Sequence, residues 1–150
     1  CISSAASDVY KRQERRYVWL LNRAQKRLHR HLEQRAEQQA GISVVQAGAL
    51  FALQRQDGAL SSELAEQLDI APSAMTGLAD RMLRAGLLER RADEQDRRIN
   101  RLWLTALGRD TGERARAELA PLNQTLAEGF SDAEMQVVSR WLTALTQRFE

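Results

Sequence analysis

The chain has 150 residues, 43% of them hydrophobic and 28% charged, which is the composition of an ordinary globular domain with a core of its own. Its formal net charge of +2 points to no class of partner, and no run approaches the roughly 18 apolar residues that a membrane-spanning helix needs. Cys1 is the only cysteine, which excludes an internal disulfide framework and leads us to expect a reducing, cytoplasmic location.

The first 13 residues, "CISSAASDVYKRQ", are set apart from the rest. They begin without methionine and are similar to translated adapter sequence. We expect residues 1–13 to be non-native or disordered, and we exclude them, with Cys1, from the predicted fold of residues 14–150.

A long amphipathic helix is predicted over about residues 14–38, where apolar side chains recur every three to four positions. Gly41 ends this segment, and Ser43 with Gln46 has the spacing of a capping box that opens a second helix. That helix ends before "QDG". The apolar positions of the two helices are Tyr17, Leu20, Leu21, Ala24, Leu28 and Leu32, then Val44, Ala47, Leu50, Phe51 and Leu53.

The segment "SELAEQLDIAPSAMTGLADRMLRAGL" predicts two short helices joined by a tight turn. Ser61 or Ser62 is expected to cap the first helix, and Ile70 to lie beneath the turn. Pro72 suits the first position of the second helix, and Gly86 suits its end. The inward stripe of the second helix is Met75, Leu78, Ala79 and Met82, and its outward face is Ser73, Ala74, Thr76, Gly77, Asp80, Arg81 and Arg84. This pattern predicts a helix-turn-helix, whose second helix enters the major groove of DNA.

A β-hairpin is predicted directly after these helices. "LLERRA" and "INRLWL" alternate as strands do, with Leu102 and Leu104 on one face, and "DEQDRR" between them is a polar tip that carries Arg97 and Arg98. Residues 106–128 are helical in composition, with a kink or interruption expected at Pro121. A second capping box, Ser131 with Glu134, opens a last amphipathic helix.

Arginines are concentrated where this arrangement would meet a duplex. All but two of the 22 basic residues are arginine, whose planar fork suits phosphates and guanine edges. Nine basic residues lie between positions 11 and 35, and seven arginines between positions 81 and 101. Solvated helix faces are the alternative explanation, but a charged hairpin directly after a helix-turn-helix predicts a wing that meets phosphates or the minor groove.

Residues 14–150 resemble the MarR family of bacterial transcription regulators. The resemblance rests on "GISVVQ", on "ELAEQLDIAPSAMTGLADRMLRAGLLERR" and, most specifically, on "DEQDRRINRLWLTALGRD". The family's wing pattern is matched by Asp93, Asp96, Arg97, Arg98, Leu104, Thr105 and Gly108. The chain departs from the family where Gln95 and Gly77 replace residues that are often arginine, and where Ala71 replaces a capping hydroxyl.

The resemblance implies a mainly α fold with a small hairpin wing: a winged helix over about residues 42–105, between dimerisation helices over about 14–38 and 106–149. It further implies a ligand-responsive, homodimeric repressor that binds an inverted-repeat operator in double-stranded DNA. The expected DNA contacts are Ser73, Ala74, Thr76, Gly77, Arg81, Arg97 and Arg98. A small-molecule pocket between the dimerisation and DNA-binding parts is implied as well, for which Trp19, Trp103 and Trp141 are candidate lining residues.

The sequence lacks the residue patterns that would indicate an enzyme or a metal site. No glycine-rich phosphate loop or nucleophile cluster indicates an enzyme, and His29 and His31 point apart on one helix, so we expect no catalysis, cofactor or metal. A thiol-based sensor would need a cysteine in the first helix, and Cys1 lies outside it. The remaining alternative is a winged-helix module that binds proteins without specific DNA binding. Such a module would have an uncharged recognition face and wing.

Overall fold

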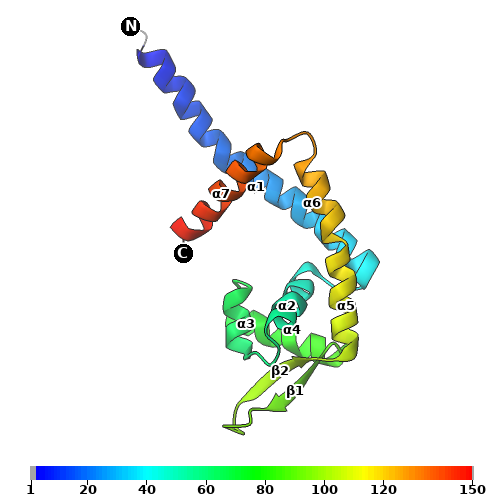
Figure 1. Cartoon of the computed structure of the whole chain (residues 1–150). Helices are drawn as coiled ribbons and strands as arrows, with labels where there is room; N and C mark the ends of the chain where they lie inside the picture. The colour runs from blue at the N-terminus through cyan, green and yellow to red at the C-terminus, as the bar shows by residue number, and fades with distance from the viewer. Residues whose placement is uncertain (1–2, 150) are drawn as a thin grey trace. The chain divides into compact units, whose positions relative to one another are not determined.

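The computed structural model describes residues 3–149, with side chains described from residue 16 onward. The elements are α1 (Ser3–Ala40), α2 (Val44–Arg55), α3 (Ser61–Gln67), α4 (Pro72–Arg84), β1 (Leu88–Ala92), β2 (Asn100–Leu104), α5 (Ala106–Ala117), α6 (Leu119–Ala127) and α7 (Asp132–Arg148). The predicted mainly helical fold with one hairpin is confirmed (Figure 1). None of the described helices is long and apolar enough to cross a membrane.

The described chain divides into two compact units, one ending at Ala115 and one beginning at Arg116. This division falls inside the region that the sequence assigns to a single domain, and the single-domain assignment stays a prediction. Residues 3–13 belong to α1. The expectation that residues 1–13 are non-native or disordered stays a prediction, and Cys1 lies outside the described residues.

The core of the first unit is built by α2, α3, α4 and the hairpin, which lie together in Figure 1. The largest fully buried side chains are Leu50, Leu53, Leu64, Met75, Leu78 and Met82. The predicted inward stripe of α4 is confirmed, because all four of its members are buried. Leu102 and Leu104 also share the buried face of β2, so the predicted alternation of this strand is correct.

The hairpin has a fixed antiparallel register. Leu88 pairs with Leu104, Arg90 with Leu102, and Ala92 with Asn100. The backbone N–H of Leu102 also donates to the carbonyl of Ala59 at 2.9 Å, so β2 is flanked on its other side by the segment before α3. The wing is therefore attached to the helical core along β2, and its tip extends beyond that attachment.

Two of the predicted helix boundaries are confirmed by their caps. The Ser43 Oγ accepts from the N–H of Gln46, and the Gln46 side chain accepts from the N–H of Ser43 at 2.8 Å. Ser131 and Glu134 form the same reciprocal box at α7. Gly41 ends α1 with a φ of 65°, which glycine adopts without a steric penalty.

One other boundary prediction is wrong, because neither Ser61 nor Ser62 caps α3. The N-cap is Leu60, whose backbone N–H donates to Glu63 Oε2 at 2.7 Å, so the carboxylate half of a capping box is present without the hydroxyl half. The interruption that Pro121 predicts is present, and it lies at Glu118, between α5 and α6. Proline has no N–H to bond the carbonyl four residues earlier, and its ring collides with that carbonyl. For Pro121 this carbonyl belongs to Ala117, which is the last residue of α5.

Candidate DNA-binding surface

The turn between α3 and α4 fixes the angle at which α4 leaves the core. Asp69 has a φ of 51°, and the N–H of Ile70 donates to the carbonyl of Ala65 at 3.0 Å. The N–H of Asp69 donates to the carbonyl of Glu66 at 3.1 Å. These two bonds are the usual pair at the C-terminus of a helix that ends in a left-handed residue. Ile70 packs against the core, as predicted, and α4 begins at Pro72. The start of α4 is therefore set by backbone bonds and apolar contact, although Ala71 offers no capping side chain.

The outward face of α4 is polar and accessible. Ser73, Ala74, Thr76, Arg81 and Arg84 are exposed, and Gly77 and Asp80 are partly exposed. The Thr76 hydroxyl donates to the carbonyl of Pro72 at 3.1 Å, which leaves its oxygen lone pairs outward. The guanidinium of Arg81 lies beside Gly77, where an added Cβ would be 3.5 Å from Arg81 Nη1. The Arg81 guanidinium therefore lies along the helix surface over Gly77, at a distance that would also accommodate a methyl group.

The hairpin tip is a loop organised by two carboxylates. Asp93 Oδ1 accepts from the N–H groups of Gln95 and Asp96 at 2.8 and 3.1 Å, and Asp96 Oδ1 accepts from the N–H of Arg98 at 3.0 Å. Arg97 and Arg98 are exposed, and within the described residues their guanidinium groups form no ion pair. The loop thus projects two cations that no carboxylate of the described chain neutralises.

The other arginines of the hairpin are paired with groups of the chain itself. Arg90 bridges to Asp80 of α4 at 2.8 Å, and Arg91 bonds Glu89 and lies 5.0 Å from the centre of the Trp103 ring. The Arg101 guanidinium pairs with Asp93 and donates to the carbonyl of Gly58 at 3.0 Å. These contacts fix the wing to α4 and to the segment before α3, so positive charge remains available at the tip and on α4.

Known proteins are similar to this chain in sequence and in fold. A model of the MarR family matches residues 40–99, which run from the end of α1 to the wing. The uncharacterized HTH-type transcriptional regulator YhbI of Bacillus subtilis is 27% identical over 109 residues, 73% of this chain and 71% of its own. The crystal structure of the MarR family transcription regulator SP03579 has a TM-score of 0.86 and 26% identity, and covers 96% of this chain and 95% of its own.

Residues 40–99 thus match the MarR family, and the chain is similar to a transcriptional regulator over 73% of its length.

A further solved structure with this fold is that of Staphylococcus aureus MepR in a complex with DNA. Its TM-score is 0.79 at 24% identity, with 89% of this chain and 96% of that chain covered. At this identity the likeness concerns the fold alone. The family model spans α2, α3, α4 and the wing tip, so the matched segment is the same unit whose outward face and arginine tip are described above.

The family's Leu-Thr-x-x-Gly segment has a physical basis in this chain. The Thr105 hydroxyl donates to the carbonyl of Gly86 at 2.6 Å and accepts from the N–H of Gly108 at 3.0 Å, so Thr105 caps α5. A Cβ on Gly108 would lie 2.0 Å from the carbonyl oxygen of Leu87. Glycine is therefore required where α5 crosses the end of α4 and the start of β1.

Asp57 is a junction that the sequence did not predict. Its Oδ1 accepts from the buried backbone N–H of Leu104 at 2.9 Å, and its Oδ2 accepts from Arg109 of α5 at 2.7 Å. Asp57 therefore joins the end of α2, the last residue of β2 and the first turns of α5. Its partners lie 47 and 52 residues away in sequence, so no local periodicity could have revealed them.

The three tryptophans lie on three separate elements, α1, β2 and α7. Trp103 belongs to the wing, where its ring lies close to Gly58 and beneath Arg91, and its role as a pocket-lining residue stays a prediction. Trp19 and Trp141 are exposed at the surfaces of their own units, and their roles stay predictions. His29 lies 3.7 Å from Glu33, and no group of three or more possible metal ligands occurs among the residues that the structure describes.

The charge of Asp93 should persist far into the acid range. Its bond from Arg101, together with those from the Asp96 and Gln95 backbones, lowers the pKa of Asp93 from 3.8 to about 2. A depressed folded pKa means that these contacts stabilise the wing fully above pH 3.8 and lose their effect as the pH falls through about 2. We expect Arg101→Gln to raise the Asp93 pKa toward 3.8, measured by carboxyl NMR titration. An unchanged pKa would show that Arg101 does not hold this carboxylate.

Proposed function

We propose that this protein acts as a homodimeric MarR family repressor that binds an inverted-repeat operator in duplex DNA. The observation that carries the proposal is the placement of an outward polar helix face and two unneutralised arginines on consecutive elements, α4 and the wing tip. A helix of this type fits the major groove, and arginines on a hairpin fit phosphates and the narrow minor groove.

The individual contacts follow from side-chain chemistry. On α4, Ser73 and Thr76 offer hydroxyl groups to base edges, Ala74 can contact a thymine methyl group, and Gly77 permits close approach of the helix. Arg81 is placed for a guanine edge or a phosphate. At the wing, Arg97 and Arg98 would neutralise phosphates. All of these residues lie on the exposed side of their elements, except that Gly77 is only partly exposed.

Homodimer formation is supported by apolar surface that each unit leaves uncovered. Neither α6 nor α7 contains a buried residue, and α1 exposes Tyr17, Val18, Trp19 and Leu20. On α7 the exposed apolar side chains include Val137, Val138, Trp141 and Leu142, and Phe149 directly after the helix is exposed as well. Burial of apolar surface is stabilising by about 25 cal/mol per Å². We therefore expect a second copy of the chain to cover these stripes. The proposed seam combines Leu20, Leu21 and Leu28 with Leu142, Leu145 and Phe149.

A small-molecule effector of unidentified chemistry would complete the regulator. PcaV from Streptomyces coelicolor, a solved structure with a TM-score of 0.74 at 24% identity, is a complex with its natural ligand. We infer that ligand binding here changes the separation of the two recognition helices and so releases DNA. We further infer a cytoplasmic protein without catalytic activity, in keeping with relatives that are transcriptional regulators.

The proposal predicts two kinds of effect on DNA binding. Arg98→Ala should weaken binding to every duplex by about tenfold, because a charge-assisted bond is lost, and should reduce the salt slope by about 0.9. Ser73→Ala or Thr76→Ala should instead change the ratio between the best site and its single mismatches, by about 1–3 kcal/mol. Fluorescence anisotropy against duplexes selected from a random pool measures both effects.

The matched control is Arg140→Gln, which removes an exposed charge from α7 and should leave DNA affinity unchanged. Weak affinity for all duplexes, with no dependence on salt, would contradict DNA recognition. That outcome would favour the alternative of a winged-helix module that binds proteins.

A further inference from the structure

One side of the long helix α1 carries a row of positive charges that lies outside the proposed DNA-binding surface (Figure 1). Between Arg16 and Leu32 the sequence has no aspartate or glutamate. All the cations of this segment are exposed, and within residues 16–149 none of them forms a hydrogen bond or an ion pair. A helix face that is merely solvated carries charges of both signs one turn apart, which this segment lacks. The row consists of Arg16, Arg23, Lys26, Arg27 and Arg30.

An exposed aromatic ring lies within this row. Trp19 is three residues after Arg16 and four before Arg23, so the three side chains share one helix face. The Arg23 guanidinium lies 4.9 Å from the centre of the Trp19 ring, and 54% of the Trp19 side chain remains exposed. The ring therefore keeps one cation in place and still offers apolar surface to a partner.

The row faces away from the apolar side of α1. Leu21 and Leu28, which belong to the proposed dimer seam, are two and nine residues after Trp19. In a helix of 3.6 residues per turn this places them about 200° and 180° around the axis from Trp19. Both leucines are partly buried, whereas Trp19 is exposed. A dimer formed through the leucine side would therefore leave Trp19 and the row accessible.

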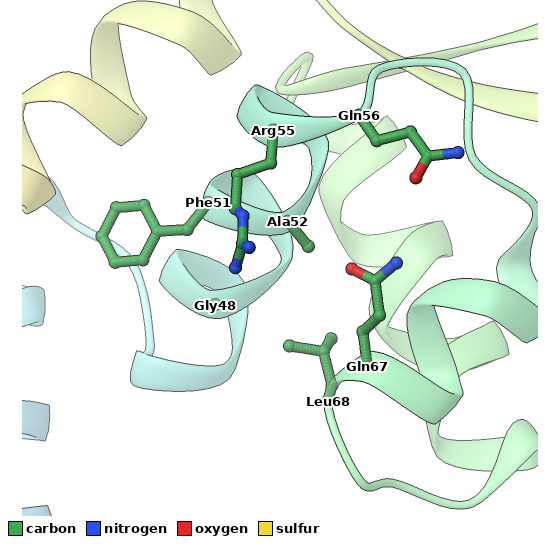
Figure 2. Close-up of a pocket in the computed structure, with 7 residues that line it drawn as sticks. All are labelled: Gly48, Phe51, Ala52, Arg55, Gln56, Gln67 and Leu68. Carbon is green, nitrogen blue, oxygen red and sulfur yellow. The ribbon is translucent and has the colours of Figure 1, made fainter.

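Positive charge is isolated or paired on α2 and at the start of α5. Arg55 is the single cation of α2, and Figure 2 shows it beside a cavity whose other labelled residues carry no charge. On α5, Arg109 pairs with Asp57 at 2.7 Å. Arg114 pairs with Asp110 at 3.2 Å. The row on α1 is thus a concentration of unpaired cations that these described helices do not repeat.

From these observations we propose that α1 binds single-stranded nucleic acid, with the row on phosphates and a base stacked on Trp19. The row spans about 21 Å, the length of about six stacked nucleotides at about 3.4 Å each. In a duplex the bases are already stacked and cannot reach the indole, whereas a single strand presents them. Helices that lie on membranes carry tryptophan on the face opposite their cations, and Trp19 lies among them. This activity goes beyond operator recognition and does not rest on it.

The test uses the full chain and labelled oligothymidylate of about 12 nucleotides, followed by fluorescence anisotropy. An oligouridylate arm distinguishes DNA from RNA as the source of the strand, and binding of either supports the proposal. Inorganic polyphosphate is the competitor that has the charge and no bases, and we expect it to compete poorly. Binding of neither strand, equal competition by polyphosphate, or binding to phosphatidylserine vesicles in place of the strands would overturn the proposal.

A matched pair of tryptophan variants tests the stacking contact. Trp19→Ala should raise the Kd for the bound strand by about tenfold or more, because one stacked base is lost. Trp141→Ala removes an exposed tryptophan from α7 and should leave the Kd unchanged. Equal effects of the two variants, or none from Trp19→Ala, would overturn the proposal.

A matched pair of charge variants tests the row and decides the matter if Trp19→Ala alters folding or assembly. Replacing Arg27 and Arg30 by glutamine should make the slope of log affinity against log salt shallower by about 1.4, since each phosphate contact on a single strand contributes about 0.7. Replacing Arg140 and Arg148 of α7 makes the same change in net charge and should leave the slope unchanged. An unchanged slope in the α1 variant would overturn the proposal.

A last arm separates this activity from the proposed function. Replacing Arg97 and Arg98 by glutamine should weaken binding to the operator duplex and leave binding to the single strand unchanged. A protein that binds the single strand but no duplex would refute the proposed function and support the α1 surface. Duplex binding without any binding of a single strand would do the reverse.

Discussion

Replacing Gly108 with alanine should destabilise the winged helix by about 3 kcal/mol or more. The new methyl group would lie 2.0 Å from the carbonyl oxygen of Leu87, a backbone atom that no side-chain rotation can remove. Overpacking of this kind usually costs about 1–3 kcal/mol, and here α5 must also shift away from the hydrogen bond between the Gly108 N–H and Thr105. Urea unfolding followed by circular dichroism measures the loss.

Gly77→Ala is the matched control, because it adds the same methyl group to another helix interior. Its nearest new contact would be the flexible Arg81 guanidinium at 3.5 Å, an ordinary van der Waals distance. Alanine is the better helix former by about 1 kcal/mol, so this variant should be slightly more stable than the natural chain. Similar losses in the two variants would show that the packing of α5 against Leu87 is not what requires glycine at position 108.

Removing the carboxylate of Asp57 should produce the second largest effect. Asp57→Ala leaves the buried N–H of Leu104 without its acceptor, at a cost of about 1–3 kcal/mol, and frees Arg109. Because Asp57 joins β2 to α5, we also expect the wing to become mobile and DNA affinity to fall. Hydrogen exchange at the Leu104 amide reports the first effect, and anisotropy the second.

The isosteric variant separates the two bonds of this junction. Asp57→Asn keeps an oxygen acceptor for Leu104 and loses only the ion pair with Arg109, whose side chain is 53% exposed. Exposed pairs contribute about 1 kcal/mol at most, so Asp57→Asn should be far milder than Asp57→Ala. Equal destabilisation in both variants would assign the effect to the charge and contradict the importance of the Leu104 bond.

Features with a local period could be predicted from the sequence. The buried stripe of α4 and the alternation of β2 repeat at 3.6 and 2 residues, and the two capping boxes have a fixed spacing of three. Gly86 at the end of α4 was recognisable because glycine is the usual residue in a left-handed cap; its φ is 70°. These local signals were sufficient to predict a winged helix and the side of it that faces outward.

The features that could not be predicted depend on contacts between distant segments. Asp80 was placed on the outward face of α4, but it bonds Arg90, whose nearness results from how the hairpin folds back. The same holds for Asp57, which meets two elements that follow much later in the chain. The tight turn before α4 was predicted, but the left-handed conformation of Asp69 was not, because aspartate adopts it only occasionally.

The central claim is that two copies of α4 and its wing read DNA together, and half-site spacing tests it most directly. Two recognition helices related by a two-fold axis should prefer half-sites about 10 base pairs apart, or about 34 Å centre to centre. Affinity is measured for inverted repeats at this spacing and at spacings changed by about 5 base pairs, half a helical turn. We predict a steep loss at the altered spacings, together with a dimer at micromolar concentration by sedimentation. Equal affinity at every spacing, or a monomer under these conditions, would contradict the account.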